Sequence, residues 1–456
     1  MKLITSNGIS RYHREFFEKV IKFGLPAVFE TLMTNIGGLL LSMIVGRNDI
    51  NDSYAAFSLA NNVFGAMSTM VVAVYVGITV VLIRHSIREG EDHGSVATTC
   101  ILFSTACAAV ISVLLYFFSS QVISLFYKNT EPHIFEATVK MFKMFTPALF
   151  FQLTTRAMTA AYRGLGNFRI PVSSMIFESV LTALFSLIFV QWMQLGMSGI
   201  VMTIVSSRII TFILLTVIWL SGKSVMKFRL PKKGSFRETI ESVKIGLPTV
   251  LDSGGVQISY LILQTILVYV GTNALKGYQA ANSVINFIYV FSSGMNVALV
   301  TVAGGYFSQM KLRKAKACAW YFTGITYLVA GSLAALCIIF SGPVISLFLK
   351  LPEAHDVGVK ILIGLCLNVL LTQFIQVMPA FFKAIGDTTT VFVIGFTGSV
   401  VVRLPFAWLF IMKLHMGWLG IILALTIDFL YRFIFYLFKT YFAFRLHPVH
   451  AKHYAK

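Results

Sequence analysis

Charged residues are scarce in this sequence of 456 residues, and that scarcity limits what the protein can be. Only 12% of the residues are charged and 57% are hydrophobic, whereas a typical soluble domain has roughly 25% charged residues. So few polar side chains cannot cover a water-soluble particle of this size. The composition therefore excludes a soluble globular protein and predicts one that crosses the bilayer several times.

Cysteine and the common catalytic motifs are also rare or missing. The absence of CxxC spacing argues against a disulfide framework or a zinc site. There is no GxxxxGK[ST] sequence for ATP and no HExxH or GxSxG sequence for a membrane-embedded enzyme. We therefore predict no enzyme, no cofactor and no bound metal. The five cysteines lie in or beside apolar stretches, as small buried hydrophobic residues do: Cys100, Cys107, Cys318, Cys337 and Cys366.

Acidic residues are half as frequent as basic ones, 18 against 37, which gives a net charge of +19. Such a charge can attract nucleic acid, but here Lys and Arg gather in the loops between apolar segments, as they do in cytoplasmic loops. We therefore expect no nucleic-acid partner. With the N-terminus inside, the outer loops hold only Arg47, Lys128, Lys276, Lys350 and Lys413. Both termini are thus predicted to be cytoplasmic.

The apolar segments divide the chain into two sets of six spans. A transmembrane helix needs about 20 apolar residues, and no cleavable signal peptide precedes the first one. The predicted domains are residues 1–221, a basic cytoplasmic linker 222–238, and residues 239–456. The predicted spans are 20–45, 54–83, 96–119, 136–162, 171–191, 198–220, 240–270, 277–307, 318–340, 357–382, 390–412 and 418–443.

The two halves of the chain repeat each other. Because each half has an even number of spans, the repeats share one topology and are related by an axis along the membrane normal. Such a pair leaves a central cleft that rocking of the two lobes opens to either side in turn. Five motifs recur in the same order and at a nearly constant separation: Gly24-Leu25-Pro26 with Gly246-Leu247-Pro248, Glu30 with Asp252, Val122–Phe126 with Val344–Phe348, Arg163–Asn167 with Lys383–Asp387, and Gly196–Ile200 with Gly417–Ile421.

These motifs resemble the multidrug and toxic compound extrusion (MATE) family, within the multidrug/oligosaccharidyl-lipid/polysaccharide flippase superfamily. The first helix of the family resembles the span with Pro26, Glu30 and the closing Ile44–Arg47. In the same way, Ser58–Asn62 resembles the start of the second helix of the family, and Arg163–Asn167 resembles the loop after its fourth helix. Arg403–Pro405 resembles a motif in its eleventh helix. The resemblance covers about residues 23–444. It implies two six-helix lobes and export of organic cations in exchange for Na⁺ or H⁺.

The sequence departs from the family where ions are usually bound. An aspartate late in helix one is replaced by Leu41, and the Asn and Asp often seen in helix five correspond to Thr182 and Ser186. The span 357–382, where some sodium-coupled members place an acid, has none. The usual ion sites of the family are therefore not intact, so the resemblance predicts the architecture but leaves the coupling mechanism open.

Four acidic residues lie within predicted spans, where an ionisable group is costly and defaults to a function. Glu30 and Asp252 each follow a proline by four residues, beside backbone carbonyls that the proline leaves unpaired. Such a carboxylate can hold Na⁺, or carry a proton when burial raises its pKa. Glu178 is a further candidate for ion coupling. Asp428 is one too, although Arg432 one turn later indicates an ion pair.

Three arginines, Arg156, Arg208 and Arg403, lie in apolar segments. We expect them to neutralise the acids, but they could instead bind an anionic group of a substrate. Amides could bind substrate as well, or join helices to one another. The predicted substrate-binding residues are Asn61, Asn282, Gln257, Gln264, Arg156 and Arg403.

The sequence thus predicts an all-α polytopic membrane protein of about twelve helices in two homologous lobes around a central cleft. We expect a monomer in the plasma (inner) membrane that exports amphipathic, cationic small molecules by antiport with H⁺ or Na⁺. The alternative is a flippase or exporter for a lipid-linked or anionic substrate, since the two activities share one fold.

Overall fold

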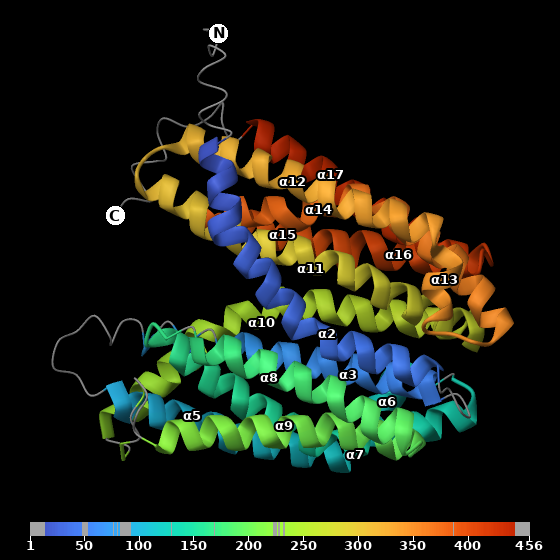
Figure 1. Cartoon of the computed structure of the whole chain (residues 1–456), viewed down its shortest axis with the longest axis horizontal. Helices are drawn as coiled ribbons and strands as arrows, with labels where there is room; N and C mark the ends of the chain where they lie inside the picture. The colour runs from blue at the N-terminus through green and yellow to red at the C-terminus, as the bar shows by residue number, and fades with distance from the viewer. Residues whose placement is uncertain are drawn as a thin grey trace, which may run out of the picture. The chain divides into compact units, whose positions relative to one another are not determined.

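The computed structural model describes residues 14–47, 53–75, 77–79, 81–82, 93–128, 130–167, 169–221, 226, 229–230, 233–385 and 387–442. A few side chains inside helices, those of Glu30 and Asp252 among them, lie outside this description. All the regular elements in these ranges are helices (Figure 1).

Helical segments occupy all twelve predicted span positions. Short helices η1 (Val20–Gly24), α6 (Ser119–Tyr127) and α13 (Ser341–Ser346) lie between or before them. The twelve segments are α2 (Leu25–Arg47), α3 (Ser53–Val74), α5 (His93–Phe117), α7 (Pro132–Gly164), α8 (Arg169–Phe185) with the π-helix η2 (Ser186–Trp192), α9 (Gly196–Leu220), α10 (Lys233–Val268), α11 (Thr272–Ser308), α12 (Leu312–Ile339), α14 (Pro352–Ala384), α15 (Thr388–Phe396) with η3 (Thr397–Val402), α16 (Arg403–Trp408) and η4 (Leu409–Lys413), and α17 (Trp418–Phe442).

Most of these segments suit a bilayer. Within the described ranges, nine are long and apolar enough to cross a membrane, and α10 adds the shorter apolar stretch Gly254–Val268. α7 is less apolar because Lys140, Lys143 and Arg156 lie in it. The chain is therefore an all-α, multi-pass membrane protein, as its composition predicts.

The sequence repeat recurs in the backbone at the ends of spans five and eleven. Gln194 and His415, which occupy matching positions in the two halves, both have φ of 50°. Gly196 and Gly417, a second matching pair, have φ of 56° and 59°. A side chain is rarely accommodated at such angles, so the same strained turn has been kept in both halves.

The loop motifs of the repeat are helix caps. The side-chain Oδ1 of Asn167 accepts a hydrogen bond of 3.3 Å from the backbone N–H of Ile170 at the start of α8. The side-chain Oδ1 of Asp387 accepts one of 3.1 Å from the N–H of Thr390 at the start of α15. Asn and Asp are preferred at this position because they satisfy N–H groups that the helix leaves unpaired.

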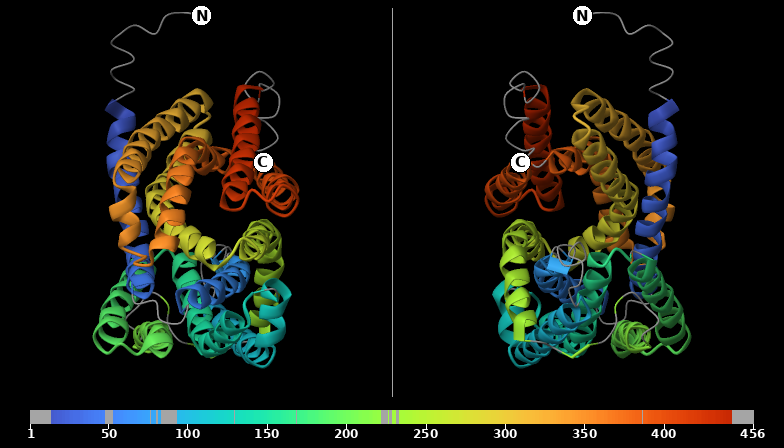
Figure 2. Two further views of the ribbon diagram at one scale, coloured as in Figure 1. Left: turned by 90° about the vertical axis from the view of Figure 1, so that its right-hand side faces the viewer. Right: turned by 90° about the vertical axis from the view of Figure 1, so that its left-hand side faces the viewer.

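The helices form two compact units. Unit 1 contains Met1–Asn35, Gly277–Ser346 and Pro352–Lys456, and unit 2 contains Ile36–Lys276 and Leu347–Leu351. The sequence repeats begin elsewhere, since α10 opens the second repeat but packs against α3 and α5 in unit 2 (Figure 2). The division into 1–221 and 239–456 therefore stays a prediction about the repeat. The last residues of the predicted linker, from Lys233, already belong to α10.

Each unit has its own apolar core. In unit 2 the buried residues include Cys100, Met158, Tyr162 and Leu215, from α5, α7 and α9. In unit 1, α14 lies beside α12 and α17 (Figure 1), and its side chains Phe374, Phe381 and Phe382 fill the space between helices. These two cores hold the segments that carry the buried charges.

Candidate ion and substrate sites

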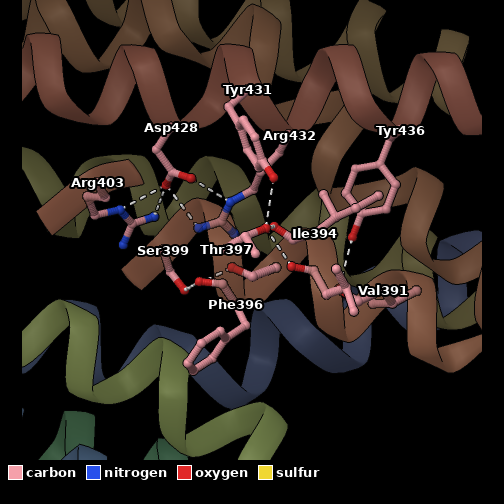
Figure 3. Close-up of polar contacts among 12 residues, drawn as sticks. Val391, Ile394, Phe396, Thr397, Ser399, Arg403, Asp428, Tyr431, Arg432 and Tyr436 are labelled. Atoms are coloured by element: carbon pink, nitrogen blue, oxygen red, sulfur yellow. Dashed lines mark hydrogen bonds and ion pairs between the residues drawn. The ribbon is translucent and has the colours of Figure 1, made fainter. Parts of the chain in front are cut away.

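A buried ion cluster in unit 1 is centred on Asp428, in the middle of α17. Figure 3 shows its carboxylate between the guanidinium groups of Arg403 and Arg432. Arg403 donates from Nε (2.8 Å) and Nη2 (2.5 Å) to Oδ2, whereas Arg432 donates from Nε to Oδ1 (2.7 Å) and from Nη2 to Oδ2 (2.9 Å). The side chains of Asp428 and Arg403 are 0% and 1% exposed. The predicted Asp428–Arg432 ion pair is confirmed, and Arg403 does neutralise an acid.

The geometry of this cluster depends on a glycine. Gly398 lies in η3, and a Cβ atom there would be 2.5 Å from both Arg432 Nε and Asp428 Oδ1. Only glycine leaves room for the two charged groups. Beside the cluster, the hydroxyls of Thr397 and Tyr431 are 2.9 Å apart (Figure 3) and join the span of α15 and η3 to α17.

The Asp428 cluster is well suited to a structural role. Charge-assisted, bidentate hydrogen bonds are strong and directional, and those described above use both carboxylate oxygens. One carboxylate between two guanidinium groups also leaves one positive charge. A carboxylate held in this way is a poor candidate for exchanging ions, although its predicted coupling role stays untested.

A second acid–arginine cluster lies in unit 2, and its contacts are looser. Glu178 of α8 and Arg208 at the centre of α9 approach to 3.6 Å between Oε1 and Nε, which is beyond hydrogen-bond distance. Their side chains are 16% and 14% exposed. The Arg208 guanidinium lies over the Phe64 ring, 4.5 Å from its centroid. Here too an arginine neutralises an acid, as predicted.

The two helices of this cluster are joined by hydroxyl groups. Thr182 Oγ1 and Ser207 Oγ are hydrogen-bonded at 3.1 Å, one turn from the charged pair. On the other side of Glu178, Ser179 Oγ accepts a 2.8 Å hydrogen bond from the N–H of Gly37 in α2. These contacts fix the backbone that carries Glu178, so the loose pairing belongs to the side chains.

Glu30 and Asp252 are the two acids that the repeat places at equivalent positions. The backbones of Glu30 and Asp252 lie in α2 and α10, and their side chains are outside the described residues. Their coupling role therefore stays a prediction. In the described part of the chain, the acids that can be assigned partners near span centres are Glu178 and Asp428.

Among the predicted amides, Gln264 is used between helices. Its Oε1 accepts hydrogen bonds from Asn62 Nδ2 of α3 and from the Tyr127 hydroxyl of α6, the latter at 3.5 Å. The unit 1 amide Gln373 similarly accepts from Ser292 and joins α14 to α11. These contacts favour the alternative role of helix joining.

Three other predicted amides have no such contact in the residues that the structure describes. Asn61 of α3 is exposed, while Asn282 of α11 and Gln257 of α10 are partly exposed. Asn61 and Asn282 are separated by the same interval as Gly196 and Gly417, so they occupy equivalent positions in the repeat. They remain the best amide candidates for contact with a ligand, and their role stays a prediction.

Some features of these sites were not predicted from the sequence. Sequence reasoning did not find that Arg403 and Arg432 share one carboxylate, nor that Gly398 makes room for them. It also missed the Phe64 ring beneath Arg208. The one available signal was the repeat itself, in which Gly398 follows Glu178 at the same interval as Lys383 follows Arg163.

The sequence is similar to a known family and to named relatives. The sequence model of the MatE family matches residues 26–188 and again residues 248–409, one match in each half. "Probable multidrug resistance protein YoeA" of Bacillus subtilis (strain 168) is 21% identical over 395 residues, which are 85% of each chain. "Probable multidrug resistance protein NorM" of Thermotoga maritima is 21% identical over 429 residues, covering 92% of this chain and 90% of the relative.

Solved structures share the fold at low sequence identity. An inward-facing multidrug resistance MATE family transporter of the MOP superfamily has a TM-score of 0.79 at 16% identity, over 91% of this chain and 96% of that one. An outward-facing conformation of such a transporter has a TM-score of 0.71 at 17% identity, over 94% and 95%. Because the family model covers more than half of the sequence and matches both repeats, the chain belongs to the MatE family of multi-pass membrane transporters.

Proposed function

We propose that this protein is a secondary active multidrug exporter that exchanges amphipathic organic compounds for H⁺ or Na⁺. The observation that carries the proposal is the match of the MatE family model to both halves of a duplicated helical fold. Both curated relatives bear the name of probable multidrug resistance proteins. The fold resembles transporters solved facing inward and facing outward, which fits alternating access between the two sides of the membrane.

The proposed coupling residues are Glu30 and Asp252, with Glu178 as a third. An ion or proton on the carboxylates of Glu30 and Asp252 neutralises them, and its loss restores a negative charge that attracts an organic cation. Ion and substrate then bind in turn, which is what exchange requires. Asp428 is the weakest of the four predicted coupling residues because two arginines already occupy both of its oxygens.

The proposed substrate is an amphipathic cation, and the proposed setting is the inner membrane with both termini in the cytoplasm. Aromatic residues make up 14% of the chain, and their faces attract cations while their surfaces bury apolar groups. We propose that the transporter acts as a monomer, since each chain contains both repeats.

Efflux of an ethidium-type dye tests the coupling residues. Glu30→Gln with Asp252→Asn is expected to abolish gradient-driven efflux while the protein still inserts into the membrane at the normal level. Glu136→Gln, which changes an exposed acid near the start of α7, is the matched control and is expected to transport normally. Undiminished efflux by the double variant would remove both residues from the coupling mechanism.

A second candidate function is export or flipping of a lipid-linked or anionic substrate. The observation that favours it is the charge near the span centres, where the described side chains include two acids, Glu178 and Asp428, and more arginines than acids: Arg156, Arg208, Arg403 and Arg432. Uptake assays with a cationic and an anionic amphiphile of equal size separate the two functions. Transport of the anion alone would favour this second candidate.

A further inference from the structure

The guanidinium of Arg208 is a poorly satisfied charged group in the described membrane helices. Its Nη1 atom is buried and has no hydrogen-bond partner among the described residues. Its Nε is 3.6 Å from Glu178 Oε1, too far for a hydrogen bond, and one face rests on the Phe64 ring. Buried donors in folded proteins are almost always paired, so this group is poised for a further acceptor.

The surrounding charge points in the same direction. Arg156 lies on α7, which packs against α9, and is close enough for its charge to repel that of Arg208. In the described part of unit 2, Glu178 is the carboxylate that pairs with Arg208. Two guanidinium groups and one carboxylate leave a net positive charge among α7, α8 and α9. Uncompensated charge inside a membrane helix bundle is costly, so one more negative group would stabilise the arrangement.

We propose that Arg208 and Arg156 form a binding site for the oxyanion, a carboxylate or a phosphate, of an amphipathic ligand. The planar guanidinium fork matches such a group with two parallel hydrogen bonds. The Phe64 ring, which is itself buried, packs against one face of the Arg208 guanidinium and leaves its edge donors for the anion. Gln152, one turn before Arg156 on α7, has a buried Oε1 without a partner among the described residues. Rotation of its amide would present N–H donors to the anion instead.

The unit 1 cluster serves as an internal reference for this site. There, Asp428 accepts two hydrogen bonds from each of two arginines, so the carboxylate of the protein already takes the place that we assign to the ligand in unit 2. The inference thus selects the arginines of unit 2 rather than Arg403. It goes beyond drug and cation export, because it assigns an acidic group to the ligand.

Equilibrium binding of 2-naphthoate to the purified full-length protein tests the site, with 2-naphthamide as the neutral probe of the same shape. We expect the wild type to bind naphthoate at least about tenfold more tightly than naphthamide. Arg208→Gln is expected to remove that preference, whereas Arg313→Gln, which removes an exposed positive charge on α12, should keep it. Equal affinity for both probes in the wild type, or an unchanged preference in Arg208→Gln, would overturn the proposal.

A variant with the opposite expected effect keeps the test decisive if Arg208→Gln does not fold. Glu178→Gln removes the carboxylate that competes for the arginines, so naphthoate should bind about tenfold more tightly. An unchanged or weaker affinity would contradict the site.

Comparing maltoside detergent with phosphatidylglycerol nanodiscs identifies the natural source of the oxyanion. Equal affinity assigns the site to a soluble ligand, and weaker binding in nanodiscs assigns it to a lipid phosphate. Because binding is measured without an ion gradient, its failure is separate from a failure of antiport.

Discussion

The two acid–arginine clusters stand at corresponding places in the two repeats but are built with opposite charges. Aligned by the Arg163–Asn167 and Lys383–Asp387 motifs, Glu178 matches Gly398. Aligned by the Gly196–Ile200 and Gly417–Ile421 motifs, Asp428 matches Ser207, the residue directly before Arg208. In the first half, span five carries the acid and span six the arginine. In the second half, span eleven carries a glycine at the matching position and Arg403 farther along, and span twelve carries the acid.

The two halves share their backbone turns and helix caps but differ in their buried charges. The turns at Gly196 and Gly417 and the caps at Asn167 and Asp387 are kept between the halves, because they satisfy or shape the backbone. The buried charges differ, because a side chain can change without moving the helix that carries it. The tightly bonded cluster of Asp428 stabilises unit 1. In the loosely bonded cluster of unit 2, Arg208 keeps a donor for the oxyanion of a ligand.

The largest effect is expected for Asp428→Asn. It leaves two buried guanidinium groups without their carboxylate, and breaking a buried ion pair typically costs about 3–5 kcal/mol. Thermal unfolding in detergent should show a marked loss of stability or of folded yield. Glu178→Gln, the counterpart in unit 2, should lose much less, since it breaks no hydrogen bond between the charged groups. Equal losses would contradict the distinction between the two clusters.

A smaller effect is expected for Gly398→Ala. The added Cβ would press on Arg432 and Asp428 at 2.5 Å, and overpacking typically costs about 1–3 kcal/mol. The same unfolding measurement applies. Gly395→Ala serves as the matched control, because a Cβ at Gly395 of α15 meets open space. If Gly398→Ala is as stable as that control, the glycine is not needed to accommodate the cluster.

The smallest effect should be the same in both halves. Gly196→Ala and Gly417→Ala place a side chain at φ of 56° and 59°, which costs roughly 1 kcal/mol or slightly more. Two similar shifts in the unfolding midpoint are expected, because the two turns share one geometry. A large difference between the two shifts would show that the matching turns do not contribute equally to the stability of the protein.

Much of the architecture could be predicted from the sequence, because it follows from local patterns. Apolar runs located the twelve helices, and the constant separation of matching motifs revealed the duplication. The Asp428–Arg432 pair was predictable since residues four apart on a helix are neighbours. The sharing of Asp428 by Arg403 was not, because it joins segments that only the packed helices bring together.

The compact units also escaped prediction, for a similar reason. Sequence similarity assigns α10 to the second repeat, while its contacts with α3 and α5 place it in unit 2. Sequence similarity reflects how the two repeats arose, whereas the compact units depend on which apolar helix faces pack together. Gln264 illustrates the point, since its bond to Asn62 joins residues from different repeats.

The central claim, exchange of an organic compound for an ion, is tested most directly by measuring the ion flux that a dye gradient drives. Proteoliposomes are prepared without an ion gradient, ethidium is added to one side, and proton or Na⁺ movement is followed with a trapped indicator. We predict an ion flux opposite to the dye that disappears with Glu30→Gln and Asp252→Asn together. Protein-dependent dye movement with no accompanying ion flux would contradict antiport.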